Sequence, residues 1–399
     1  MVIFLSVREV AIRKYKGSKY GIQEARALRV IRVLPVLDYG GVETTVVQQA
    51  IYMDRSGIDF RICTFWKKGA AAEVIEDAGI PVDVLHVDPS IGNPGATLSL
   101  WKYLRRRRPD ILHCSITEAN FHGALAGKLQ GDCLTITEEV GDPSLRSWKA
   151  HGVVGLSMHL ADHCIGVSGP SAAYISETLR VSESKVSHID NGIAPLAVLG
   201  EEERVEARRE LGISEDAVVI GSVGRLDEEV KRFTDIVEAL SLIDGEEREV
   251  VFLLVGDGRD REPIEAHIRQ RGLEDQVILT GYRSDMERMY AAMDIFCLLS
   301  AHEAFGLVVA EAMFCELPVV VSDVGGMSGV VVDGQTGFKV PAFAPEEAAS
   351  RLEELIESTE LRSVMGNAGR KRALKRYSAE RYVRELRELY FRLADSRVS

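Results

Sequence analysis

The stretch Asp294–Met313 reads DIFCLLSAHEAFGLVVAEAM, and its succession of apolar run, polar loop and second apolar run decides the fold. Residues 294–300 are too few for an ordinary helix and include β-favouring side chains, which predicts a buried strand. Gly306 marks a turn, and the residues from Leu307 onward predict a helix. A strand that leads directly into a helix is half of a βαβ unit, so this stretch predicts a parallel sheet covered by helices.

Two glutamates, Glu303 and Glu311, stand in this otherwise apolar stretch. Burying an ionised carboxylate is unfavourable unless something binds it, so a partner is expected. We expect Glu303 in the loop and Glu311 about one turn into the helix, where they accept hydrogen bonds from sugar hydroxyls and from a ribose. Free N–H groups near Gly306 would then meet phosphate. The spacing alone also fits one loop glutamate and one exposed helix glutamate.

The same alternation of short apolar runs and helical patterns continues along most of the chain. The stretch Asp190–Glu203 contains an Asn-Gly turn signal, a proline and an acidic run, and it separates two such series. We therefore predict an α/β protein of two doubly wound, Rossmann-like domains that face each other across a cleft. The predicted strands are 28–36, 60–65, 82–87, 110–114, 133–137, 163–167 and 185–189, and then 217–223, 249–255, 276–281, 294–300 and 317–322.

Four parts follow from this division. Residues 1–27 form a basic arm, residues 28–195 a first Rossmann-like domain and residues 196–377 a second. Residues 378–399 combine charge pairs at helical spacing with an apolar stripe, and they are predicted to form a helix that packs back on the first domain.

The net charge of −13 argues against nucleic acid as the main partner, because phosphate neutralisation needs basic surface. Against this trend, residues 1–29 contain seven basic and two acidic side chains, and Arg105–Arg108 form a second basic run. The simpler interpretation of residues 1–29 is a solvated extension, and that of Arg105–Arg108 is a helix end whose cations complement the helix dipole. For both segments the alternative is contact with an anionic membrane. No segment approaches about 18 uninterrupted apolar residues, so no spanning helix is expected.

The six cysteines lie far apart and form no CxxC pair. They are expected to be reduced, buried side chains of a cytoplasmic protein, with peripheral attachment to the inner face of the membrane as the alternative. Neither a metal site nor a resident cofactor is predicted, and the chain has no DxD motif.

Three further loops follow predicted strands. Gly40 and Gly41 would let backbone N–H groups at a helix N-terminus approach an anion. In GRLDEEVK (224–231), Arg225 and Lys231 suit a diphosphate. The VGDG stretch (255–258) lacks the third glycine of a dinucleotide fingerprint and is poor support for NAD.

As an ordered set these motifs resemble one known family. The order is the glycine pair after the first strand, the Asn-Gly at the linker, GR-x5-K, VGDG, Gly281 at a strand end, E-x7-E, LPVVVSDVGG and DGQTGF. It resembles the retaining GT-B glycosyltransferases of family 4 over roughly residues 29–395. The resemblance implies transfer of a sugar from a nucleotide-diphosphate donor, a UDP-sugar ahead of a GDP-sugar, to a hydroxyl of a carbohydrate, lipid-linked or small-molecule acceptor. It also implies that the domain of residues 28–195 takes the acceptor and the domain of residues 196–377 the nucleotide-sugar. Cell-envelope polysaccharide or glycolipid synthesis would be the setting.

The resemblance also implies roles for individual residues. Arg225 and Lys231, after Gly224, neutralise the diphosphate as it leaves, and Glu303 contacts hydroxyls of the donor sugar. The remaining donor contacts are Glu311 to the ribose, Ala304, Phe305, Gly306 and Leu307 near the phosphates, Tyr282 and Arg283 to the base, and Gly40 and Gly41 closing over the donor.

The chain departs from the family pattern at three places. Glu139 stands near the position where members often have a histidine, so it is the acceptor-side candidate and the catalytic residue there stays open. Glu316 replaces a usual glycine, and Gly329 stands where a glutamate often follows the glycine pair. A GT-B epimerase or phosphorylase and a non-catalytic nucleotide-sugar-binding subunit are the alternatives. A dinucleotide-binding oxidoreductase and a P-loop ATPase lack their fingerprints here.

Overall fold

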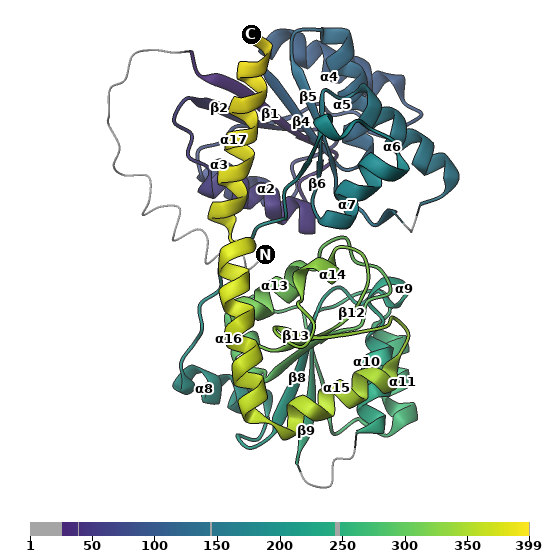
Figure 1. The fold of residues 1–399 in the computed structure, drawn as a ribbon, viewed down its shortest axis with the longest axis vertical. Coiled ribbons are helices and arrows are strands. Elements are labelled where there is room, and N and C mark those ends of the chain that lie inside the picture. The colour runs from purple at the N-terminus through teal and green to yellow at the C-terminus, as the bar shows by residue number, and fades with distance from the viewer. Residues whose placement is uncertain (1–25, 39, 144–145, 244–247, 399) are drawn as a thin grey trace. The chain divides into compact units, whose positions relative to one another are not determined.

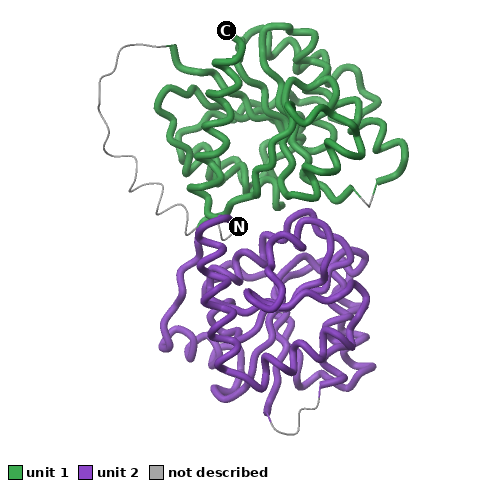
Figure 2. Tube along the Cα trace, viewed as in Figure 1, with its two compact units in different colours: residues 1, 3–194, 378–399 green, residues 2, 195–377 purple. Residues whose placement is uncertain are grey.

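A computed structural model describes residues 26–38, 40–143, 146–243 and 248–398, which form two compact units (Figures 1 and 2). The first unit contains the described residues up to Ala194 together with Ser378–Val398, and the second contains Pro195–Tyr377. Apart from Arg26 and Ala27, the predicted basic arm lies outside the described residues.

The first unit is built on a seven-stranded parallel sheet of order β3-β2-β1-β4-β5-β6-β7. Strand β1, third in this order, pairs with β2 and β4, which places Val30 between Phe60 and Ile111. The strands are β1 (Leu28–Leu34), β2 (Ile58–Thr64), β3 (Val82–Val84), β4 (Ile111–Ser115), β5 (Leu134–Glu139), β6 (His163–Gly166) and β7 (Val186–His188).

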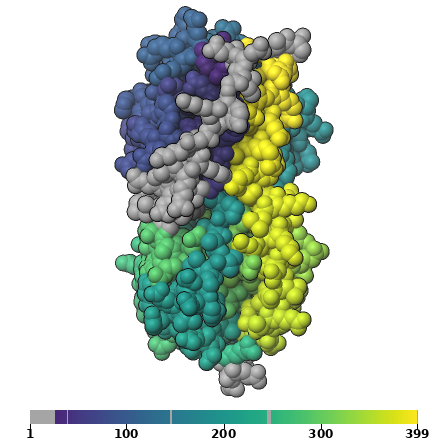
Figure 3. Space-filling view, turned by 90° about the vertical axis from the view of Figure 1, so that its left-hand side faces the viewer, coloured from purple at the N-terminus to yellow at the C-terminus, as the bar shows by residue number. Residues whose placement is uncertain are grey.

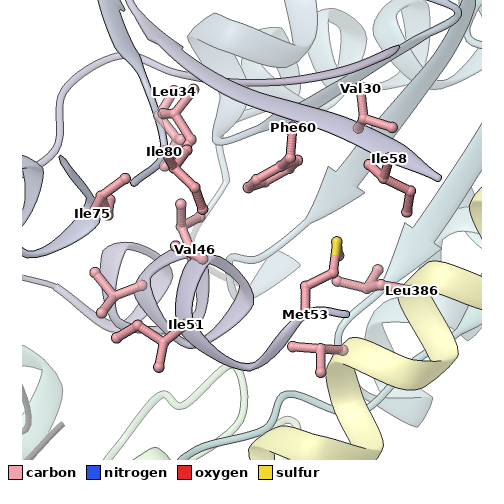
Figure 4. Close-up of a cluster of buried hydrophobic side chains, with 14 of the residues drawn as sticks. Val30, Leu34, Val46, Ile51, Met53, Ile58, Phe60, Ile75, Ile80 and Leu386 are labelled. Carbon is pink, nitrogen blue, oxygen red and sulfur yellow. The ribbon is translucent and has the colours of Figure 1, made fainter. Parts of the chain in front are cut away.

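Helices cover both faces of this sheet. One face packs on α2, α3 and α17 through a core that includes Val30, Leu34, Val46 and Leu386 (Figure 4). The other packs on α4 and α5. The helices are α2 (Gly41–Tyr52), α3 (Ala71–Asp77), α4 (Pro94–Arg107), α5 (Thr117–Gln130), α6 (Trp148–Leu160), α7 (Gly169–Ala173), the π-helical turn Tyr174–Thr178, the 3-10 turn Glu183–Lys185 and α17 (Ala379–Val398).

The second unit repeats the design with a six-stranded parallel sheet of order β10-β9-β8-β11-β12-β13. Its strands are β8 (Val218–Val223), β9 (Val250–Val255), β10 (Val277–Gly281), β11 (Ile295–Leu298), β12 (Val319–Ser322) and β13 (Gly337–Val340). Its helices are α8 (Glu201–Leu211), α9 (Glu228–Lys231), α10 (Phe233–Leu242), α11 (Arg261–Arg271), α12 (Met286–Ala292), α13 (Leu307–Phe314), α14 (Met327–Val330), α15 (Pro345–Glu357) and α16 (Thr359–Arg376).

One carboxylate anchors α8 to this second sheet. Asp294, just before β11, accepts hydrogen bonds from Arg204 and Arg208 of α8 at 2.6 Å each and from the backbone N–H of Val219 at 2.7 Å. Because the two guanidinium groups share one carboxylate, the amino ends of β8 and β11 are tied to the helix that opens the unit.

The two expected doubly wound domains are therefore confirmed as two parallel sheets flanked by helices, and the last helix returns to the first sheet. The six cysteines are free, and five of them are buried. Among the described residues, none of the helices has the length and apolar character that a membrane span requires.

The last helix, α17, docks beside the segment that leaves the first unit. Ala379 N–H donates to the carbonyl of Ile193 at 2.8 Å, and Arg381 Nη2 donates to the carbonyl of Asp190 at 2.6 Å. A Cβ on Gly192 would lie 2.3 Å from the Cβ of Tyr382, so only glycine fits there. The glycine of the Asn-Gly pair thus admits the C-terminal helix, and the outer side of α17 forms part of the molecular surface (Figure 3).

Beneath α17 lies a buried polar network. Arg32 of β1 and Glu138 of β5 form an ion pair with no more than 1% of either side chain exposed. Arg32 Nη1 also lies 2.7 Å from His113 Nδ1, and the same ring nitrogen lies 2.7 Å from the Tyr390 hydroxyl. Gln49 Nε2 of α2 donates to that hydroxyl at 2.8 Å. Burial and the adjacent Arg32 hold the pKa of His113 well below its usual value, so the imidazole is neutral.

Glu316, where the family usually has glycine, adopts a positive φ of 61° just before β12. This left-handed conformation is unfavourable for a residue with a Cβ. The backbone of α16 packs tightly against this residue, because a Cβ on Gly366 would lie 1.9 Å from the carbonyl oxygen of Glu316. This close packing holds Glu316 in its conformation.

We expect Tyr390→Phe to loosen α17. The substitution leaves buried polar atoms of His113 and Gln49 without their shared partner, which costs about 1–3 kcal/mol. The measurement is the free energy of opening from hydrogen exchange on α17 peptides. Tyr382→Phe on the same helix is the matched control, because the Tyr382 hydroxyl is buried without a hydrogen-bond partner among the described residues. Equal protection in both variants would contradict a stabilising role of the network.

Candidate functional site

The loops that follow four neighbouring strands of the second unit are joined by backbone hydrogen bonds. Gly224 N–H, after β8, donates to the carbonyl of Val255 at 3.0 Å, and Gly256 N–H, after β9, donates to that of Gly281 at 3.0 Å. Ala301 N–H, after β11, donates to the carbonyl of Val230 in α9 at 2.9 Å. The carboxyl ends of β8, β9, β10 and β11 therefore carry one connected set of loops, which is where parallel sheets bind ligands.

The glycines of VGDG serve this contact between loops. Gly256 has a φ of 140°, and a Cβ there would lie 1.8 Å from the carbonyl oxygen of Gly224. A Cβ on Gly258 would lie 2.3 Å from the carbonyl oxygen of Leu226. Close backbone approach thus accounts for the motif without a dinucleotide.

Lys231 and Glu303 meet at the centre of these loops. Lys231 Nζ lies 2.5 Å from Glu303 Oε2, and 19% and 16% of the two side chains are exposed. Lys231 is the last residue of α9, and the carbonyl of Glu303 accepts the N–H of Gly326 at 2.9 Å, so backbone contacts fix both residues. A cation and an acceptor held together in a half-buried position can bind the two parts of a polar ligand that has both anionic and hydroxyl groups.

Helix α13 begins directly beside this pair. Gly306 precedes it with a φ of 88°, a conformation that favours glycine. Phe305 is buried, and its ring lies edge-on to Tyr377 with the centroids 5.5 Å apart. The aromatic side chain therefore packs in the interior, and the part of Phe305 left for a ligand contact is its backbone. The N–H of Val309 donates to the carbonyl of Gly306 at 3.0 Å. The amides of Leu307 and Val308 before it have no such acceptor among the described residues and can bind an anion. Ala304 lies in the same loop.

Glu311 lies in the second turn of α13 and is 5% exposed. Its Oε2 accepts the hydroxyl hydrogen of Tyr290, in α12, at 2.7 Å. Burial raises the pKa of Glu311 from 4.5 to about 7, and the Tyr290 hydrogen bond opposes that rise. Tyr290 is the partner that the sequence pattern did not reveal, because it lies 21 positions away on another helix.

Arg225, Tyr282 and Arg283 occupy the rim of these loops. Arg225 is the most open, with 79% of its side chain exposed and its nearest carboxylate, Asp227, at 3.9 Å. Arg283 Nη2 donates to Asp285 at 2.6 Å and to Glu210 at 2.9 Å, and these contacts raise its pKa. The Arg283 guanidinium is therefore already paired, whereas the Tyr282 side chain is exposed.

In the first unit, the predicted glycine pair begins helix α2. Gly40 is the N-cap, and Glu43 three residues later turns back so that its Oε2 would meet a Cβ on Gly40 at 2.4 Å. This arrangement is related to a capping box, in which a glutamate three residues after the N-cap turns back toward it. The glycine-x-x-glutamate spacing in the sequence is the local pattern that indicates this helix start. Burial raises the pKa of Glu43. Tyr39, beside the pair, lies outside the described residues.

Glu139, the acceptor-side candidate, ends strand β5 and is engaged from two sides. Its two oxygens accept hydrogen bonds from Arg146 at 2.6 Å each, and Gly141 N–H donates at 2.9 Å. Arg146 in turn lies over the ring of Tyr174, 5.7 Å from its centroid. Nothing in the local sequence pointed to Arg146, because the pairing depends on how the loop after β5 folds back.

The structure thus brings Gly224, Lys231, Glu303 and Gly306 together in the second unit, with Glu311 buried behind them. Gly40, Gly41 and Glu139 belong to the first unit, after strands β1 and β5. Among the described residues, no cluster of three or more His, Cys, Asp or Glu side chains is arranged to hold a metal ion.

Sequence patterns of known families match both units. The pattern of glycosyl transferases group 1 matches residues 203–372, and that of glycosyltransferase family 4 matches residues 39–195. The N-acetyl-alpha-D-glucosaminyl L-malate synthase of Bacillus anthracis is 30% identical over 186 residues, which is 47% of this chain and 48% of the relative. The alignment therefore spans about half the length of that relative.

Longer similarities extend over both units. The D-inositol 3-phosphate glycosyltransferase of Kribbella flavida is 26% identical over 326 residues, covering 79% of this chain and 72% of the relative. The crystal structure of Anabaena Alr3699/HepE in complex with UDP and glucose superposes with a TM-score of 0.80, at 22% identity, over 91% of this chain and 99% of that chain. Family patterns and fold agree over both units, and the chain therefore belongs to the group 1, or family 4, glycosyltransferases with the GT-B fold.

Proposed function

We propose that this protein transfers a sugar from a nucleotide-diphosphate donor to a hydroxyl acceptor with retention of anomeric configuration and without a metal ion. The pairing of Lys231 with Glu303 at 2.5 Å, beside the first turn of α13, is the observation that carries the proposal. A cation suited to phosphate, a carboxylate suited to sugar hydroxyls and the unpaired first amides of α13 belong to one set of loops, which supports the proposal. UDP is the preferred nucleotide, because the Anabaena protein of the same fold binds UDP and glucose.

In this proposal the charges act on the leaving group. As the bond between the anomeric carbon and the diphosphate breaks, negative charge grows on the phosphate oxygen, and Lys231 and Arg225 oppose it. Glu303 leaves Lys231 to accept hydrogen bonds from the donor sugar. The acceptor oxygen attacks on the same face that the phosphate leaves, and its proton passes to the departing phosphate.

The other donor contacts surround this centre. The amides after Phe305 and Gly306 bind the phosphates, Glu311 accepts from the ribose, and the segment of Tyr282 and Arg283 contacts the base. Since the Arg283 guanidinium is already held by Asp285 and Glu210, the base contact falls to Tyr282 and the backbone.

From the first unit we propose Gly40 and Gly41, at the start of α2, as a donor contact. Glu139, paired with Arg146 at the end of β5, is the proposed acceptor-side group. The acceptor is a carbohydrate, lipid-linked or small-molecule hydroxyl. Relatives named for capsular polysaccharide and lipopolysaccharide core biosynthesis support a role in cell-envelope polysaccharide or glycolipid synthesis at the cytoplasmic side.

The proposal predicts donor binding and slow donor hydrolysis without an acceptor. Millimolar UDP should raise the melting temperature of the purified chain more than GDP does, because a ligand that binds only the folded state stabilises it. Release of UDP from UDP-sugars should continue unchanged in EDTA, since side-chain cations take the place of a divalent ion. Activity that is lost in EDTA and restored by manganese would contradict the metal-free site, and binding without any turnover would indicate a non-catalytic subunit.

Lys231→Ala should lower turnover by about 10²–10³, the scale for losing one preorganised electrostatic contact. Glu303→Gln should also depress turnover more than donor affinity, because the lost charge lies near the anomeric carbon. The measurement is turnover and donor affinity on folded protein. Lys371→Ala, at an exposed position of α16, is the matched control and should leave both unchanged. Near-parental turnover of both site variants would show that the pair is structural.

Glu311→Gln should separate stability from donor binding. Between pH 4.5 and 7 the folded state holds the Glu311 proton that the unfolded state releases, so the stability of the parent falls as pH rises through this window. Glutamine does not ionise, so the variant does not lose stability in this way. Its free energy of unfolding should exceed that of the parent by up to about 2–3 kcal/mol above pH 7 and by little near pH 4.5.

The same variant should bind the donor about 1–2 kcal/mol more weakly, because the ribose loses a charged acceptor. Unfolding curves at several pH values and donor titrations check the two effects. A stability difference that does not change with pH would contradict the buried ionisation, and unchanged donor affinity would remove Glu311 from the ribose contact.

A further inference from the structure

Helices α4, α5 and α6 form one layer of the first unit and carry an unusual set of charges. α4 packs against α5 and α5 against α6, as their neighbouring positions in Figure 1 show. Together the three helices contain six lysines and arginines and a single acidic residue, Glu118. The whole chain has a net charge of −13, so this layer is a local reversal of the protein's charge.

The cations of α4 are free to meet a partner. Among the described residues, the ion pairs of this helix involve Arg107, which binds Asp83 at 3.1 Å, whereas Lys102, Arg105, Arg106 and Arg108 are exposed with no carboxylate within 4.0 Å. The Arg105 guanidinium lies over the Trp101 ring, 5.0 Å from its centroid. A helix end needs fewer cations than this to complement its dipole.

A groove of about 520 Å³ borders the same helix, and Lys102, Arg106 and Arg107 line it together with Asp83. Asp83 is neutralised within the protein, because it also accepts hydrogen bonds from the Tyr103 hydroxyl at 2.6 Å and from Arg61 at 3.3 Å. The groove is therefore left with excess positive charge of a kind that suits a phosphate group.

Large apolar side chains are exposed on the same layer. Leu98 of α4 is 47% exposed, Leu129 of α5 66%, and Trp148 and Leu156 of α6 80% and 48%. Trp148, Gly152 and Leu156 follow one another at helical spacing, so α6 shows an apolar stripe to the outside. A polyanion in solution would use the cations and leave these side chains in water, whereas a lipid surface would use both.

We propose that the outer face of α4, α5 and α6 binds the surface of an anionic lipid bilayer. The cations of α4 approach the lipid phosphates, with the groove beside β3 taking a headgroup, and Trp148, Leu156, Leu98 and Leu129 enter the interface between headgroups and acyl chains. This surface does not rest on the proposed transfer reaction, and it is separate from the loops of the second unit that carry Lys231 and Glu303.

The test is sedimentation of the full chain with vesicles of phosphatidylglycerol and phosphatidylcholine, compared with vesicles of phosphatidylcholine alone. The triple variant Lys102→Glu, Arg105→Glu, Arg106→Glu should lose at least about 100-fold in partitioning onto the anionic vesicles. The matched control, Arg269→Glu, Lys371→Glu, Lys375→Glu, makes the same change of net charge at exposed positions of the second unit and should bind like the parent. Binding of the parent should weaken steeply with salt.

A second arm tests the apolar contact. With Trp66 changed to Phe, the two remaining tryptophans, Trp101 and Trp148, belong to this layer, and their emission should move to shorter wavelength when anionic vesicles are added. Trp148→Ala with Leu156→Ser should abolish that part of the binding which survives high salt. UDP-dependent melting of every variant shows that the fold and the donor site are intact, so failure of this surface can be told from failure of the proposed function.

Three outcomes would overturn the inference. In the first, the charge-reversed triple variant binds anionic vesicles as well as the parent, which would move the contact to residues 1–25 or to another surface. In the second, the triple variant and its control lose binding equally, which would reduce the effect to net charge. In the third, the parent binds an acidic polysaccharide or DNA through Lys102, Arg105 and Arg106 and ignores the vesicles.

Discussion

The ion pair between Arg32 and Glu138 lies in the middle of the first sheet, where neither charge reaches water. Such a pair is costly to bury unless the remaining donors and acceptors find partners. His113 supplies one partner from the sheet, and the hydroxyl of Tyr390 on α17 closes the network. The N-terminal sheet therefore depends on the last helix of the chain, although His113 and Tyr390 lie 277 positions apart in sequence.

The second unit shows a comparable arrangement at the carboxyl edge of its sheet. Glycines at 256 and 258 let the loops after β8 and β9 touch through their backbones. Lys231 and Glu303 neutralise each other in that frame. The arrangement keeps two half-buried charges satisfied in the free protein, and a donor with both phosphate and hydroxyl groups can replace each of them as partner. Preorganisation of this kind is what electrostatic catalysis requires.

Charge is distributed unevenly over the protein. Its acidic residues outnumber its basic residues by 13 over the chain, yet three adjacent helices of the first unit are almost without acid. The loops with Lys231 and Glu303 and this helix layer belong to different units and different elements. The proposed donor site and the proposed lipid-binding surface can therefore be tested by separate substitutions.

The sequence by itself determined the alternation of strands and helices, the parallel sheets, the division near residue 195 and the family. These features follow from local apolar periodicity and from motif order, which are read along the chain. It also singled out Glu303, because a carboxylate in an apolar stretch is conspicuous, and Lys231, because a cation that follows a strand suits a phosphate. Only the tertiary structure decided that Tyr290 binds Glu311, that Arg146 binds Glu139, and that Gly192 makes room for α17. These contacts join residues from separate elements, and the packing of those elements, which no local pattern records, brings them within hydrogen-bonding distance.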